Sequence, residues 1–196
     1  MVKQKYKYFF FLFIGCILFL NSFHFFVFQE KEIEIEKKIL GENITNREEN
    51  VKNIIKKKKY IGILEIPRIN LQRGFYDFGF KENNVNQNIE VIESSLMPNQ
   101  RFGNLILAAH SGNSKVSYFK NLYKLEIGDI AYVYYVDKYY TYQLVNVYDE
   151  EKDGTVLIRR NNNQTNLTLI TCDKNAKDKQ NVYIFALISD LEEFQQ

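Results

Sequence analysis

Two residues with the chemistry of a nucleophile and a base, Cys172 and His110, each end an apolar run of this 196-residue sequence. The runs read LTLITC and LILAAH, and beyond residue 28 the chain contains no other cysteine or histidine. A thiol reacts as its thiolate, and an imidazole is the usual neighbour that exchanges its proton. Side chains at strand ends can face a cleft while the strand fixes their backbone. These residue types therefore suit nucleophilic catalysis through Cys172.

The same two residues also have a structural interpretation. A cysteine is often a small buried apolar residue, and a histidine is often a hydrogen-bonded structural one. Residue types alone leave both interpretations open. We expect no disulfide within the domain, because Cys16 lies in the apolar N-terminal segment. Two possible ligands do not make a zinc centre, so we expect no metal and no cofactor.

Short strands are the elements that would carry these residues. From Tyr60 onward the chain contains seven apolar or alternating runs, IGILEIPRINL, GNLILAAH, IAYVYYV, YYTYQLVNVYD, GTVLIRR, NLTLITC and NVYIFALI. The first should be an edge strand, since Pro67 cannot donate to a ladder. Asp137-Lys138 should close a hairpin, and VSYFKNLYKL alone has helical spacing. This pattern predicts an all-β domain, either a barrel or a sandwich.

An uncharged segment, residues 9–28, precedes the predicted strands and reads FFFLFIGCILFLNSFHFFVF. As a helix it would span ~30 Å, the thickness of a bilayer core. A cleaved signal peptide would have a shorter apolar core and an A-x-A-like site, and a soluble helix with apolar residues all round would be hard to cover. Three lysines precede the segment. We therefore expect a single-pass transmembrane signal anchor in the plasma membrane, with residues 1–8 cytoplasmic and the rest extracellular.

Residues 29–59 mix both charge signs and contain few apolar positions, so we expect an extracellular charged linker before a folded domain over residues 60–196. The net charge is only +2, with 26% charged residues. A nucleic-acid-binding domain would need a concentrated basic face. We therefore expect a membrane-attached protein with no nucleic-acid partner.

Four pieces of the sequence resemble the sortases, the membrane-anchored cysteine transpeptidases of Gram-positive bacteria. LTLITC resembles the family's T-L-x-T-C signature, and GNLILAAHSG resembles its G-N-x-x-x-A-x-H strand end. YFKNLYKLEIGDIAYV resembles an F-x-x-L-x-x-L-x-x-G-D segment, and GILEIPRI resembles the opening strand. The pieces follow the family order over residues 60–188. The resemblance implies an eight-stranded β-barrel with one or two short helices.

The resemblance also implies a reaction. Cys172 would attack the Thr-Gly bond of an LPXTG-like sorting signal and form a thioacyl intermediate. His110 would protonate the leaving amine and deprotonate the incoming one. The acceptor amine would belong to a lipid-linked cell-wall precursor or to a pilin lysine. Thr171 would help to orient the substrate, or it is simply a β-branched strand residue.

The sequence departs from the family at one catalytic position. Sortases carry an arginine at the start of the strand that follows the cysteine, whereas this segment reads DKNAKDKQNVYIFAL. Counting back from Ala186 puts Asn181 in the arginine's place, with Gln180 and Lys179 just before it. Any of the three could donate to an oxyanion. An amide makes a weaker hydrogen bond to developing negative charge than a guanidinium does.

Several choices stay open within this family. The segment between Tyr148 and Cys172 has no room for the long helix of class B sortases, and no D-P-[WFY] lid motif of class C precedes the domain, so we expect a class A, D or E-like enzyme. The pair Arg159-Arg160 should be a solvated strand end, with contact to a substrate carboxyl as the alternative. Two other functions are a catalytically weak domain that binds sorting signals and an extracellular cysteine hydrolase.

Overall fold

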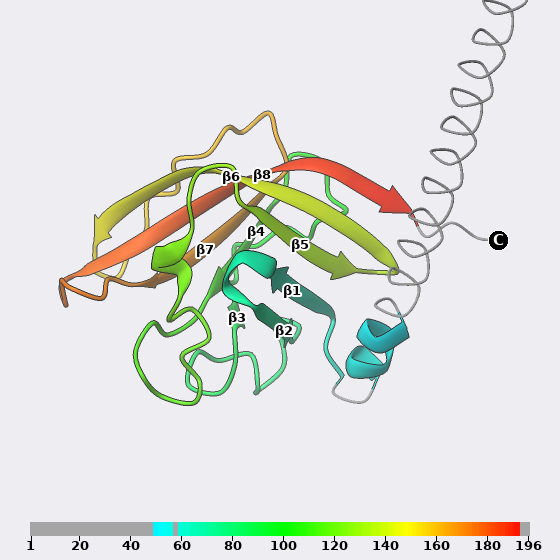
Figure 1. Cartoon of the computed structure of the whole chain (residues 1–196), viewed down its shortest axis with the longest axis horizontal. Coiled ribbons are helices and arrows are strands. Elements are labelled where there is room, and N and C mark those ends of the chain that lie inside the picture. Colours follow the sequence, from blue (N-terminus) through cyan, green and yellow to red (C-terminus); the bar gives the residue numbers. More distant parts are fainter. Residues whose placement is uncertain (1–48, 57–58, 193–196) are drawn as a thin grey trace, which may run out of the picture. The chain divides into compact units, whose positions relative to one another are not determined.

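The computed structural model describes residues 49–56 and 59–192 (Figure 1). The expected anchor, residues 9–28, lies outside the described residues, as does most of the expected linker. Within the described ranges, no helix combines the length and the apolar character needed to cross a membrane.

Eight strands make up one sheet, which curls into a nearly closed barrel (Figure 1). They are β1 (Gly62–Ile66), β2 (Leu71–Phe75), β3 (Glu90–Val91), β4 (Asn104–Ala108), β5 (Ile130–Tyr135), β6 (Lys138–Glu151), β7 (Asn166–Cys172) and β8 (Lys179–Glu192). Their order is β2-β1-β5-β6-β8-β7-β4-β3. Every neighbouring pair is antiparallel except β4 and β7, which are parallel. The all-β, eight-stranded prediction is confirmed.

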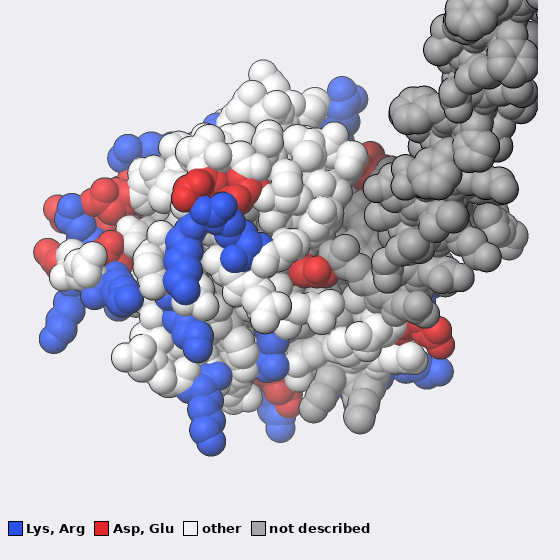
Figure 2. Space-filling view, in the orientation of Figure 1, with Lys and Arg blue, Asp and Glu red and all other residues white. Residues whose placement is uncertain are grey.

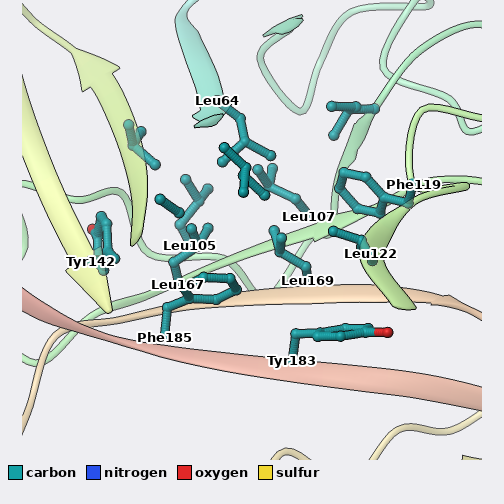
Figure 3. Packing of buried hydrophobic residues seen from close by; sticks show 14 of the residues in the cluster. Leu64, Leu105, Leu107, Phe119, Leu122, Tyr142, Leu167, Leu169, Tyr183 and Phe185 are labelled. Carbon is teal, nitrogen blue, oxygen red and sulfur yellow. The ribbon is translucent and has the colours of Figure 1, made fainter. Parts of the chain in front are cut away.

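Alternating side chains of three adjacent strands fill the barrel interior (Figure 3). Leu105 and Leu107 of β4 lie beside Leu167 and Leu169 of β7, and Leu167 lies opposite Phe185 of β8. All five are fully buried. Burying one such side chain stabilises the fold by roughly 1.5–3 kcal/mol. This layer fixes β4 and β7 just before the positions where each strand reaches its candidate catalytic residue.

Two strand predictions are wrong. The first run is not an edge strand, because β1 pairs with both β2 and β5, and Pro67 lies after it at the start of the 3-10 helix η1 (Pro67–Ile69). The run GTVLIRR, residues 154–160, forms no strand. There the Tyr148 hydroxyl accepts a hydrogen bond from the Arg159 N–H and donates one to the Leu157 carbonyl oxygen. The Tyr148 hydroxyl thus takes hydrogen bonds that the backbone of a neighbouring strand would otherwise make.

The predicted helix over residues 116–125 is reduced to turns and the 3-10 helix η2 (Leu122–Lys124). Phe119 and Leu122 of this segment are buried in the core as expected, but Tyr123 is exposed. The Phe119 N–H donates to the carbonyl oxygen of His110 at 3.0 Å. The backbone of Phe119 is therefore bonded to the residue after the end of β4, where an α-helix would need a bond within the segment.

Residues 49–56 are helical, and the part from Val51 onward packs on the barrel. Val51 is buried in a small cluster with Ile63 of β1 and Tyr134 of β5, and Ile54 and Ile55 pack against it. The compact unit accordingly begins at Val51, earlier in the chain than the expected start at residue 60.

Candidate active site

The parallel pairing of β4 and β7 brings the ends of these two strands side by side. The Thr171 hydroxyl donates to the Ala109 carbonyl oxygen at 2.7 Å, and the Ser111 hydroxyl donates to the Cys172 carbonyl oxygen at 2.7 Å. His110 lies between Ala109 and Ser111. Two hydrogen bonds therefore hold the backbone that carries the histidine against the backbone that carries the cysteine.

The imidazole of His110 contacts a residue that sequence analysis missed. Its Nε2 lies 3.2 Å from Oδ1 of Asn86, in the loop between β2 and β3. The Asn86 N–H in turn donates to Oδ1 of Asn84 at 2.8 Å. When Nε2–H donates to this amide oxygen, Nδ1 remains as the atom that exchanges a proton with a substrate. The asparagine-rich run NNVNQN gave no indication of this role, because only the fold brings the loop to β4.

The thiol of Cys172 also has a neighbour that the sequence did not indicate. Nζ of Lys152 donates to Cys172 Sγ at 3.3 Å. Lys152 directly follows β6, which is not adjacent to β7 in the sheet. The contact therefore depends on tertiary structure. A cation beside a thiol favours the reactive thiolate form.

Thr171 is buried, and its hydroxyl is used within the fold. The hydrogen bond to Ala109 ties β7 to the end of β4, which is a structural role. A substrate-orienting role for its backbone stays a prediction.

Asn181 lies opposite Thr171 in the β7–β8 ladder, and its side chain is turned to the loop after the cysteine. Its Nδ2 donates to Asp173 Oδ2 at 2.9 Å. The other oxygen of Asp173 accepts the N–H groups of Asn175 and Ala176. These two backbone donors, helped by the Asn181 amide, hold the pKa of Asp173 below its ordinary value. The amide that the sequence placed at the arginine position thus stabilises a neighbouring carboxylate.

The two alternative donors also have partners. Gln180 lies opposite Cys172, but its Nε2 donates to the carbonyl oxygens of Glu151 and Thr155 at 3.1 and 3.0 Å. Nζ of Lys179 lies 2.6 Å from Asp149 Oδ2. A donor role toward a substrate for either residue stays a prediction, and it would require these bonds to break.

Arg159 and Arg160 do not form a strand end, because residues 154–160 form no strand, but Arg159 is exposed as expected. Arg159 forms an ion pair with Glu150 at 2.6 Å. The Arg160 guanidinium donates to the Phe102 carbonyl oxygen at 3.1 Å and to two further oxygens near the start of β7.

The surface around the barrel carries both charge signs. Figure 2 shows basic and acidic side chains interspersed on the face in view. Among the residues that the structure describes, no group of three or more histidine, cysteine, aspartate and glutamate side chains is placed to hold a metal ion. The reactive groups near the ends of β4 and β7 are the thiol of Cys172, the imidazole of His110 and the ammonium of Lys152.

Comparison with known proteins adds family evidence to this geometry. A family model described as the Sortase domain matches residues 64–189. Sortase A of Bacillus anthracis is 28% identical over 130 residues, which cover 66% of this chain and 60% of that protein. The matched region therefore spans less than two thirds of this curated relative.

Solved structures share the fold. Sortase A of Listeria monocytogenes has a TM-score of 0.58 and 20% identity, over 69% of this chain and 92% of that one. Sortase C of Streptococcus pneumoniae has a TM-score of 0.57 and 25% identity, over 67% of this chain and 70% of that one. Structures of both kinds, A and C, thus have the same barrel as this chain.

Proposed function

This chain belongs to the sortase family, and we propose that it is a cysteine transpeptidase with Cys172 as nucleophile and His110 as acid and base. One observation carries the proposal: the parallel β4–β7 pairing, closed by the Ser111 and Thr171 hydroxyls, holds the two residues on adjoining strand ends. Such backbone fixation supplies the proximity that a two-residue mechanism needs.

The proposed substrate is a surface protein with an LPXTG-like sorting signal. The Cys172 sulfur forms a bond to the threonine carbonyl carbon, the C–N bond to glycine breaks, and His110 gives its proton to the departing amine. A second amine, from a lipid-linked cell-wall precursor or a pilin lysine, then loses a proton to His110 and takes the acyl group. The thiolate is released again. The sortase C of S. pneumoniae is described in terms of pilin substrate specificity, which supports a pilin as one of the proteins joined by this reaction.

We place the chain among the compact class A, D or E-like sortases. The connection from Lys152 to Thr165 between β6 and β7 contains no helix, and all of it is described. This supports the exclusion of class B.

We also propose that residues 9–28 anchor the protein in the plasma membrane with the barrel outside the cell. The support is the uncharged length of this segment and the lysines before it. Protease added to intact cells should release a fragment that begins within residues 29–59. Protection of this region from external protease would reverse the proposed orientation.

The reaction is tested with the full chain and sorting-signal peptides, with and without an amine acceptor. We expect a mass adduct on Cys172 and an acceptor-dependent joined product. Cys172→Ala should abolish both, whereas Cys16→Ala, the matched control, should change neither.

The same assay separates the alternatives. A binding domain would retain peptide without an adduct, and a hydrolase would release the free acid at a rate that does not depend on the amine. Unchanged turnover in Cys172→Ala would remove the cysteine mechanism altogether.

A further inference from the structure

A lysine, rather than an arginine, lies at the nucleophile of this chain. Nζ of Lys152 is 3.3 Å from Cys172 Sγ. We propose that Lys152 supplies the positive charge that stabilises the Cys172 thiolate and then the oxyanion that forms when the thiolate attacks. This inference rests on the proposed transpeptidase function. It assigns the charge to the residue that directly follows β6, away from the β8 position where the sequence pattern suggested a donor.

The backbone of Lys152 is fixed from both sides. Its N–H donates to the carbonyl oxygen of Asp178 at 2.7 Å, and the carbonyl oxygen of the preceding Glu151 accepts Gln180 Nε2 at 3.1 Å. Gln180 lies opposite Cys172 on β7, so β8 stands between the lysine backbone and the cysteine. The lysine side chain nevertheless reaches the sulfur. Gln180 therefore holds the backbone at Glu151, the residue before Lys152.

Two other lysines near Cys172 in the structure or the sequence contact other groups. Lys179 pairs with Asp149, and Lys174 lies over the ring of Tyr123 with its Nζ 4.4 Å from the centroid. The nearest acid in the sequence, Asp173, accepts hydrogen bonds from three N–H groups through its carboxylate. The cation in contact with the sulfur is the ammonium of Lys152.

An ammonium at this place suits the movement of charge in the reaction. On attack, a sulfur electron pair forms the S–C bond and the carbonyl π pair moves to oxygen, so negative charge shifts from sulfur to an atom bonded to the same carbon. The lysine stem is flexible enough for Nζ to follow this shift. When the oxyanion pair returns, the C–N bond breaks and His110 protonates the amine. Lys152 keeps its proton throughout.

The thiolate role is tested by alkylation, which needs no substrate. The full chain reacts with iodoacetamide at pH 7, and mass spectrometry of the peptide containing Cys172 gives the rate without a contribution from Cys16. Lys152→Met should lower the rate about two- to fivefold, the range expected for loss of an exposed ion pair. Lys152→Arg should restore it, and Lys174→Met, the matched control, should leave it unchanged.

Salt gives a second readout in the same assay. Added salt should slow alkylation of the wild-type chain, because it screens an exposed pair, and should have less effect on Lys152→Met. Lys152→Gln repeats the comparison with a polar neutral side chain, in case the methionine variant folds poorly. Equal alkylation rates in wild type and in both neutral variants would overturn the proposal.

The oxyanion role is tested by single-turnover acylation with a sorting-signal peptide. Lys152→Met should lower this rate about tenfold or more, beyond its effect on alkylation, because donor loss at an oxyanion acts on the transition state. A loss no larger than the alkylation effect would overturn this role. If the wild-type chain forms no adduct with any peptide, the proposed function fails, while the alkylation comparison still decides whether Lys152 supports the thiolate.

Discussion

His110 depends for its orientation on a residue that lies far from it in the sequence. The Asn86 amide oxygen, 3.2 Å from Nε2, comes from the loop before β3, and the Asn84 side chain holds the backbone of that loop residue. A neutral amide fixes the ring plane without placing a charge beside it. The atom that would exchange protons with substrate, Nδ1, is thereby given a defined direction.

Removal of this amide should impair catalysis and leave binding intact. Asn86→Ala should lower kcat about tenfold to a hundredfold with KM unchanged, because a misoriented imidazole loses part of the roughly 10²–10⁴-fold that general acid–base catalysis contributes. Asn86→Asp should recover much of the rate, since it keeps the acceptor. Asn163→Ala, at an exposed loop position, is the control, and peptide turnover is the measurement. An unchanged kcat in Asn86→Ala would mean that the ring is oriented by other contacts.

The residues of the site differ in how far the sequence could identify them. Cys172 and His110 could be proposed from the sequence, because they are single residues of their types in the domain at the ends of apolar runs. Lys152 and Asn86 were not, because their neighbours in the chain carry no signal and only the strand order brings them to the thiol and the imidazole. The roles of Asn181 and Thr171 could not be judged from register alone, since each side chain finds a partner within the fold.

At the scale of elements, the hairpin between β5 and β6 was correctly predicted, but its turn lies one residue earlier. Tyr135 pairs with Lys138, so Val136 and Asp137 form a two-residue loop. Both have positive φ, 48° and 57°, as in a type I′ turn. Asp137 tolerates this conformation and accepts the Tyr134 hydroxyl. A β-branched valine is strained there.

Relief of this strain should stabilise the barrel. Val136→Asn should raise the free energy of unfolding by about 1 kcal/mol, because asparagine adopts positive φ more readily. Little burial is lost, since Val136 is 61% exposed. Val147→Asn, on an exposed strand position of β6, is the matched control and should lower stability through strand propensity. Urea unfolding followed by circular dichroism measures both, and a destabilised Val136→Asn would show that the valine contributes packing that outweighs the strain.

Strands with strong apolar alternation were found from sequence, and those with weak signals were not. β2 reads LQRGF and contains a glycine and an arginine, while β3 has only two residues. Conversely, the apolar run over residues 154–160 predicts a strand, whereas in the structure the Tyr148 hydroxyl bonds the backbone of Leu157 and Arg159. The local sequence pattern indicates that a segment is able to form a strand. Whether it does depends on whether the fold places another strand beside it.

At the scale of the whole molecule, the feature that creates the site is the parallel contact between β4 and β7. The three elements between them, η2, β5 and β6, carry the chain around the barrel before β7 returns to β4. Apolar periodicity indicates strands but not which strands are neighbours, so the residues alone left a barrel and a sandwich open. The family resemblance implied an eight-stranded barrel, and the structure confirms it.

The closed packing of this barrel also sets its response to alkaline pH. Burial, with smaller contributions from Tyr140 and Asp190, raises the pKa of Tyr142, and burial together with Asp173 raises the pKa of Tyr183 to about 12. The Tyr142 hydroxyl has no hydrogen-bond partner within the described part of the chain. Both side chains belong to the core in Figure 3. In the folded barrel each therefore loses its proton at a higher pH than an exposed tyrosine does.

The free energy of unfolding should consequently fall as pH rises from 10 to 12. An unfolded tyrosine ionises near its ordinary pKa of 10.0, whereas folded Tyr183 ionises at about 12, so in this window the unfolded state binds fewer protons and is favoured. The stabilisation is fully present below pH 10 and is lost as the pH passes the folded values, by up to about 1.4 kcal/mol per group and pH unit. Urea unfolding at pH 9 and 11 should show a smaller loss in Tyr142→Phe/Tyr183→Phe than in wild type. Tyr123→Phe, at an exposed position, should behave as wild type. An equal loss in the double variant would assign alkaline unfolding to other groups.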